Sequence, residues 1–99
     1  MNREQNICSF ADEGTSDIFG GNNSKKARRV LPVELHNKAR RIMEAMDKVS
    51  NINGLRQYEL KRLAGDRADQ FSLRVNRQYR ICFEWKNEEI HFVQILDYH

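Results

Sequence analysis

The second half of the chain alternates between apolar and polar positions. Apolar residues recur at every second position in residues 71–75 and again in residues 79–85, and residues 90–96 form a third apolar-rich segment. A period of two is typical of strands that bury one face. Polar residues at 86–89 predict a turn, and a short strand is also expected at residues 60–63. The pattern therefore predicts an antiparallel meander.

The first half of the chain has helical periodicity instead. Apolar residues at spacings of four and three predict an amphipathic helix over residues 32–50, and Pro32 suits its first turn because the missing N–H has no helical partner there. A helical stretch is also expected at residues 24–29, a short strand at 7–10, and a loop with one helical turn at 12–21. The apolar stripe of the long helix consists of Leu35, Ala39, Ile42, Met46 and Val49.

These elements predict an α+β fold, in which a compact antiparallel sheet carries two helices from the N-terminal half on one face. The 99 residues suit one core, so residues 1–99 are expected to form a single domain. No apolar run approaches the roughly 20 residues of a membrane span. Residues 1–10 lack the apolar centre of a secretory signal, which predicts a cytoplasmic protein with no membrane partner.

The register of the central hairpin brings positive charges together. A three-residue loop at 76–78 aligns the two apolar faces, and this places Arg74 directly opposite Arg80 on the other face. Like charges in such a pair destabilise a sheet by up to about 1 kcal/mol. We therefore expect an anion to be held there, with Arg77 and Arg67 near enough to contribute; the alternative is two arginines extended into solvent. The same register pairs Val75 with Tyr79, Leu73 with Ile81 and Phe71 with Phe83.

Positive charge is concentrated in two segments. The net charge is +3, but residues 21–41 contain seven bases and one acid, and residues 56–80 contain seven bases and three acids. Arg outnumbers Lys by eleven to six, and the planar Arg fork suits phosphate. This distribution indicates an anionic partner, although a solvated basic helix face explains the charge equally well.

The chain ends in groups that can exchange protons. Asp97, Tyr98 and His99 directly follow the last predicted strand, and His suits general acid or base work near neutral pH. RNA cleavage by its own 2′-hydroxyl requires a proton acceptor, cations around the phosphate and a proton donor for the leaving oxygen. Neither cysteine, Cys8 or Cys82, lies in a metal-ligand spacing, so we expect reduced thiols, no metal and no cofactor.

Several fragments, in order and at matching spacing, resemble the HigB-type toxins of the RelE superfamily, also known as the plasmid maintenance killer family. The resemblance covers most of the chain, from about Cys8 to the end. The fragments include Phe10-Ala11-Asp12, Asp17-Ile18-Phe19, Ser24-Lys25-Lys26-Ala27-Arg28-Arg29, Leu60 to Asp66, Gln70 to Asn76, Gln78 to Phe83 and Asp97-Tyr98-His99.

The resemblance implies a toxin that enters the ribosomal A site and cleaves mRNA there, without a metal. Its catalytic arginine corresponds to Arg80, and the C-terminal acid, aromatic residue and His correspond to Asp97, Tyr98 and His99. Lys61 stands where some members carry a catalytic His, and Ala64 stands where many carry a Lys, so the identity of the general base stays open. Further RNA contacts are expected from Arg62, Arg67, Arg74, Arg77, Lys25, Lys26, Arg28 and Arg29.

The resemblance also implies partners. These are a small helix-turn-helix antitoxin of the HigA type, and the ribosome with its mRNA, including contacts to 16S rRNA. Operator DNA would be reached only through the antitoxin. The alternative is a toxin that does not cleave RNA: the ParE-type relatives share the fold and are thought to act on DNA gyrase, and a protein that simply blocks the ribosome fits as well.

Overall fold

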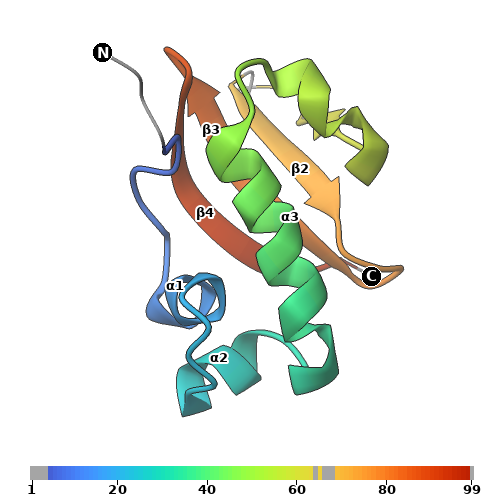
Figure 1. Ribbon diagram of the computed structural model, residues 1–99. Helices are drawn as coiled ribbons and strands as arrows, with labels where there is room; N and C mark the ends of the chain where they lie inside the picture. The colour runs from blue at the N-terminus through green and yellow to red at the C-terminus, as the bar shows by residue number, and fades with distance from the viewer. Residues whose placement is uncertain (1–4, 64, 66–68, 99) are drawn as a thin grey trace.

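The computed structural model describes residues 5–63, 65 and 69–98, and its fold is α+β as predicted (Figure 1). Helices and 3-10 turns occupy the N-terminal half, and an antiparallel sheet of four strands follows. The helical elements are α1 Glu13–Phe19, α2 Lys25–Val30, the 3-10 helix η1 Val33–Leu35, α3 His36–Lys48 and the 3-10 helix η2 Ile52–Tyr58. The strands are β1 Lys61–Arg62, β2 Gln70–Arg74, β3 Tyr79–Lys86 and β4 Glu89–Asp97.

The sheet is a meander with the strand order β1-β2-β3-β4. Its central hairpin has the predicted register, with Leu73 paired to Ile81 and Arg74 paired to Arg80. The loop residue Asn76 accepts hydrogen bonds from the backbone N–H groups of Gln78 and Tyr79, which closes the three-residue turn. Because β1 pairs only with the first part of β2, the end of β2 near Arg74 is an exposed sheet edge.

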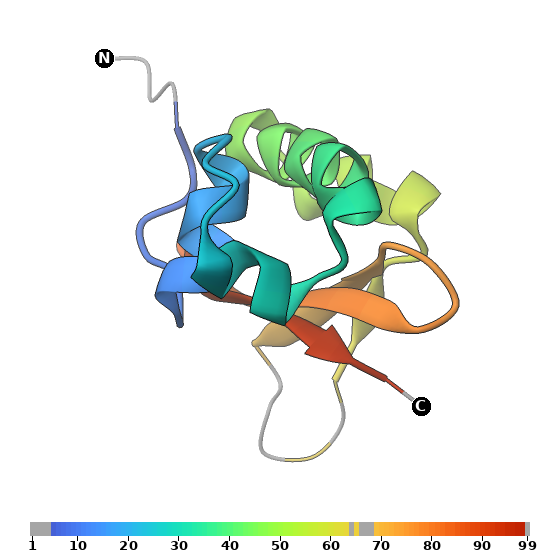
Figure 2. The same cartoon turned by 90° about the horizontal axis from the view of Figure 1, so that it is seen from below.

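The long helix α3 covers the apolar face of the sheet, as Figures 1 and 2 show. The predicted stripe is confirmed, since Ala39, Ile42 and Met46 are buried and the other two members pack against the same core. The predicted start near Pro32 was wrong. Pro32 has the extended angles φ −54° and ψ 140°, so a 3-10 turn intervenes and the α-helix begins at His36. No helix among the described residues is long and apolar enough to cross a membrane.

The helix α1 replaces the single turn that was expected at residues 12–21. The carboxylate of Asp12 caps it by accepting a hydrogen bond from the backbone N–H of Thr15 at 2.7 Å. The helix then packs closely on α2, because a Cβ atom on Gly14 would lie 2.4 Å from Cγ2 of Val30. The expected helical stretch at residues 24–29 is confirmed as α2.

The segment between α3 and β1 differs most from the prediction. Sequence periodicity ends the long helix near Asn51 and places no element before residue 60, whereas the structure has η2 there. Leu55 is completely buried, so this 3-10 segment is held by the core rather than by a repeating apolar pattern. It ends at Glu59, which has a left-handed backbone with φ 55°. The chain then turns into β1, which lies within the predicted strand at residues 60–63.

Candidate functional site

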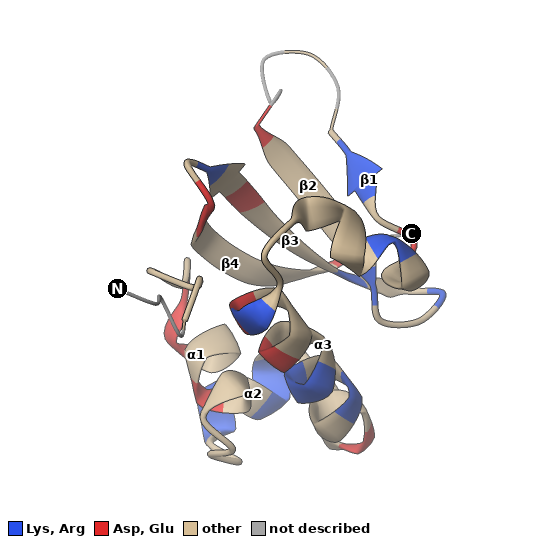
Figure 3. Ribbon diagram, turned by 45° about the horizontal axis from the view of Figure 1, so that its top comes forward, with Lys and Arg blue, Asp and Glu red and all other residues tan. Residues whose placement is uncertain are grey.

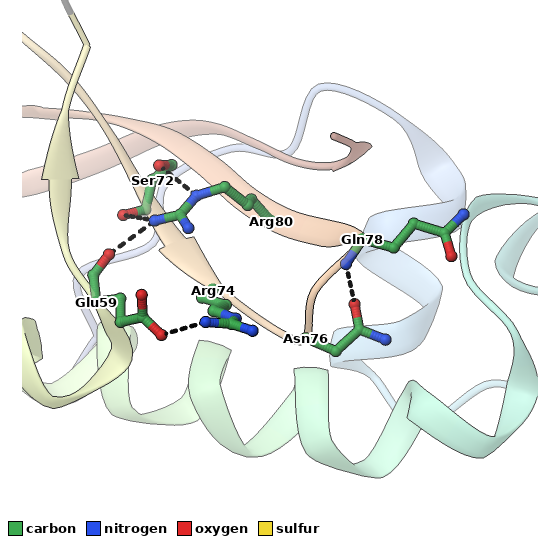
Figure 4. Close-up of polar contacts among 6 residues, drawn as sticks. All are labelled: Glu59, Ser72, Arg74, Asn76, Gln78 and Arg80. Atoms are coloured by element: carbon green, nitrogen blue, oxygen red, sulfur yellow. Dashed lines mark hydrogen bonds and ion pairs between the residues drawn. The ribbon is translucent and has the colours of Figure 1, made fainter. Parts of the chain in front are cut away.

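Arg80 lies on the face of the sheet opposite α3 and is half-buried. Its Nε donates a hydrogen bond to Oγ of Ser72 at 2.8 Å, and its Nη2 donates to the backbone carbonyl of Glu59 at 2.7 Å (Figure 4). Ser72 is 1% exposed, so one partner is rigidly held within β2. Nη1 of Arg80 donates to no other residue in the described part of the chain. The guanidinium is therefore oriented by the fold while one of its amino groups is left to contact a ligand.

The predicted pair of opposed arginines is present, but the anion beside it comes from the protein. The carboxylate of Glu59 binds Nη1 of Arg74 at 2.8 Å, while the carbonyl of the same residue accepts the bond from Arg80. The left-handed backbone of Glu59 turns both groups toward the hairpin. This ion pair is largely exposed, so it contributes little to stability, about 0–1 kcal/mol. An external anion is consequently not required to explain why the sheet tolerates both arginines.

A basic groove runs along the exposed edge of β2, between that strand and α3. Its volume is about 610 Å³, and it extends from η2 to the hairpin loop. Its lining includes four basic side chains, one acidic side chain and one tyrosine: Lys38, Arg41, Arg74, Arg77, Glu59 and Tyr58. In Figure 3, blue segments mark the Lys and Arg positions of α3 and of the hairpin loop. Four cations against one carboxylate make this groove suitable for a phosphate backbone.

The two basic residues of β1 extend the positive surface. Lys61 is directly paired with Ser72, so its side chain leaves from the face that carries Arg80. Arg62 is paired with Phe71 and leaves from the other face. Both side chains are exposed. Lys61 is thus in the same cross-strand row as Ser72, the serine that positions Arg80.

The C-terminal residues are tied to the hairpin loop. The backbone N–H of Tyr98 donates to the carbonyl of Gln78, and the amide of Gln78 donates to Oδ2 of Asp97 at 3.0 Å. Asp97 is paired with Tyr79, whereas Leu96 is paired with Arg80. Side chains of paired residues share a face, so Asp97 leaves from the side of Tyr79, which is the core side. The structure therefore separates Asp97 from the face of Arg80, and Tyr98 lies just beyond β4 with its backbone bonded to the hairpin loop.

The remaining predicted residues lie elsewhere. Lys25, Lys26, Arg28 and Arg29 are all exposed on α2, which packs on α1 rather than on the hairpin. Figures 1 and 3 place α1 and α2 beyond one edge of α3, and η2 and the hairpin beyond the other. Lys26 forms an exposed ion pair with Glu13 at 3.0 Å. These four residues form a second basic surface, separate from the basic groove. Arg67 and His99 lie outside the described residues.

Three functional features were missed in the sequence. Glu59 carries no pattern of its own, and its role depends on η2, which was not predicted. Ser72 occupies a polar position of its strand, and the hairpin register places it diagonally to Arg80, but nothing else in the sequence connects the two residues. Lys38 and Arg41 lie off the apolar stripe of the long helix, and only the packing of α3 on the sheet shows that they line a groove with the hairpin.

A family model described as the RelE-like toxin HigB of type II toxin–antitoxin systems matches residues 8–99. The chain belongs to the HigB-like toxin family. It is accordingly a toxin of a type II toxin–antitoxin system, and an antitoxin is its partner. No curated protein matches the chain significantly. The matched residues of this HigB-like toxin include Arg80, the basic groove, the two bases of β1 and the four bases of α2, so the family match covers the whole candidate site.

Proposed function

We propose that this HigB-like toxin is a metal-independent endoribonuclease that cleaves mRNA in the ribosomal A site. The observation that carries the proposal is the orientation of Arg80, whose guanidinium is held by Ser72 and Glu59 with Nη1 left to contact a phosphate. A preorganised cation stabilises the charge that develops on a phosphate during cleavage. The basic groove next to it supplies contacts along the RNA backbone, which position a nucleic acid without reading its bases.

The reaction we propose is a transphosphorylation. The 2′-oxygen of the mRNA attacks the adjacent phosphorus as its proton passes to a base, and the bond to the 5′-oxygen breaks as that oxygen takes a proton. The products are a 2′,3′-cyclic phosphate and a 5′-hydroxyl. Arg80 neutralises the phosphate oxygens, His99 and Lys61 are the proposed proton carriers, and Tyr98 positions the nucleotide. Asp97 acts through Gln78, to which it is hydrogen-bonded.

The proposal also includes three partners of the toxin, which are an antitoxin, 16S rRNA and the ribosome that carries the mRNA. The antitoxin is proposed to be a helix-turn-helix protein of the HigA type, through which the complex reaches operator DNA. The basic surface on α2 is proposed to contact 16S rRNA, because it is separate from the basic groove and all four of its bases are exposed. Since the described part of the basic groove has one aromatic residue, Tyr58, it offers little stacking for single-stranded bases. The ribosome is therefore needed to present the mRNA.

The experiment that tests the proposal is transcript mapping. Expression of the toxin alone should arrest growth and create new 5′-hydroxyl ends within translated mRNA, and co-expression of the neighbouring antitoxin gene should remove both effects. Purified mRNA should be cut rapidly only when ribosomes are present. Growth arrest without new transcript ends would instead support a toxin of the non-cleaving, ParE-like class.

Glu59→Gln should strengthen RNA binding while leaving the fold intact. The substitution removes the carboxylate that neutralises Arg74 but keeps the backbone carbonyl that holds Arg80. One added positive charge in the basic groove should raise the affinity for a short RNA about two- to fivefold at low salt and steepen its salt dependence. The measurement is fluorescence anisotropy at several salt concentrations.

The matched control is Glu44→Gln, which makes the same change on an exposed part of α3 outside the basic groove. An equal gain in affinity for both variants would mean that RNA responds only to net charge. That result would contradict the assignment of RNA to the basic groove.

A further inference from the structure

The N-terminal segment is fixed against the start of β4 by several hydrogen bonds. The backbone N–H of Cys8 donates to the carbonyl of Ile90 at 2.7 Å, and the N–H of Ile90 donates to the carbonyl of Asn6 at 2.9 Å. Asp47 of α3 accepts from the N–H groups of Asn6 and Ile7 at 2.9 and 2.8 Å. Only two parallel bridges form where a strand was predicted, at Ile7 and at Phe10. They are enough to set the N-terminal segment that contains Cys8 beside β4; Figure 1 shows this segment next to the strand.

This pairing assembles three metal-ligating side chains. The thiol of Cys8, the carboxylate of Glu89 and the imidazole of His91 have ligand atoms within 4.8 Å of one another. Nε2 of His91 lies 3.3 Å from Oε1 of Glu89. Zinc bonds to nitrogen and oxygen of about 2.0–2.1 Å in a tetrahedral site give a ligand–ligand separation of about 3.3 Å. The separation of His91 and Glu89 therefore matches one edge of a zinc tetrahedron, and the Cys8 sulfur lies within 4.8 Å of both ligand atoms.

We propose that Cys8, Glu89 and His91 form a zinc site with a fourth position open to water. Thiolate, imidazole and carboxylate are the three ligand types that Zn²⁺ uses in proteins, whereas Ca²⁺ and Mg²⁺ prefer oxygen alone. Binding releases the thiol proton to the solvent as the sulfur–zinc bond forms. Cys8 is exposed and the other two side chains are partly exposed, so the metal can reach all three.

The surrounding charges favour a cation. Glu84 is paired with His91 and Lys86 is paired with Glu89, so the same face of the sheet adds one acid and one base. With the thiolate of Cys8 and the carboxylate of Glu89, the site then has three negative groups and one positive group. Sequence spacing predicts no metal at Cys8, because Glu89 and His91 lie at the other end of the chain and approach it only through the pairing of Ile7 with Ile90.

The position of the site indicates what zinc does there. Glu89 and His91 are at the start of β4, while Leu96, which is paired with Arg80, is near its end. A metal bound between Cys8 and β4 joins the N-terminal segment to the sheet and acts on stability rather than on the arginine site. The inference is thus independent of RNA cleavage.

Cobalt and zinc binding to the untagged full-length toxin tests the proposal. Co²⁺ should give a thiolate-to-cobalt charge-transfer band and the visible bands of a tetrahedral site, at one equivalent. Zn²⁺ should abolish these bands by displacing cobalt and should raise the unfolding temperature. Cys8→Ser should remove the charge-transfer band, and Glu89→Gln or His91→Asn should weaken zinc binding at least about tenfold in competition with a chromogenic chelator.

One control separates this site from the other thiol of the chain. Cys82→Ser changes the buried thiol and should leave the cobalt spectrum unchanged. Circular dichroism checks the fold of each variant. Absence of a thiolate band in the wild-type protein would overturn the proposal, as would its persistence in Cys8→Ser or its loss in Cys82→Ser.

Discussion

Arg80→Ala should abolish growth arrest and reduce ribosome-dependent mRNA cleavage by about 10²- to 10³-fold, which is the usual effect of removing one preorganised group that stabilises developing charge. Ser72 and Glu59 hold the guanidinium in one orientation, and Ala retains neither the positive charge nor these contacts. Arg80→Lys should recover only a small part of the activity. It keeps the positive charge but has no fork to donate to Ser72 and to a phosphate together.

The matched control is Arg56→Ala, which removes an exposed arginine from η2 without touching the site. The quantities to measure are growth, cleavage at mapped transcript ends and the free energy of unfolding. Arg80 lies on the non-core face, but Ser72 is buried and loses its donor in Arg80→Ala, so we expect the free energy of unfolding to fall by about 1–3 kcal/mol. A folded Arg80→Ala protein with wild-type cleavage would move the catalytic role to Lys61, Arg62 and Arg74.

The central hairpin was predictable because two independent constraints agree. The apolar positions of β2 and β3 repeat every two residues, so a shift of one residue would turn a whole apolar row to solvent. The loop then has room for only three residues, 76–78, and the pairing of Arg74 with Arg80 follows. The positions of the two arginines therefore follow from the alignment of apolar faces in two strands that are neighbours in sequence.

The partners of those arginines were not predictable in the same way. Residues 52–58 show no clear helical period, and their 3-10 helix exists because Leu55 is buried in the core. Glu59 is positioned by the end of that helix and by a left-handed backbone, neither of which leaves a pattern in the sequence. The sequence identified the positive charges correctly but attributed their counter-anion to a ligand. Long-range packing supplies that anion from within the chain.

His99→Ala should lower cleavage by about 10²- to 10⁴-fold, the range typical for loss of a positioned acid or base. The residue before it, Tyr98, is anchored by a backbone hydrogen bond to Gln78, which is two residues from Arg80 in sequence. Asp97 leaves from the opposite face and contacts Gln78, so Asp97→Asn should cost much less. Asp97→Asn should unfold at the wild-type denaturant concentration, since Asp97 is exposed and outside the core. The same measurement checks the fold of His99→Ala.

The decisive measurement is the ranking of the two variants in single-turnover cleavage on programmed ribosomes. Single turnover separates the chemical step from product release, and ribosome binding measured in parallel separates it from affinity. A loss in His99→Ala that appears only in binding would assign that residue to RNA positioning. A larger loss in Asp97→Asn than in His99→Ala would show that the proton is handled on the core side of β4, through Gln78, and not beside Arg80.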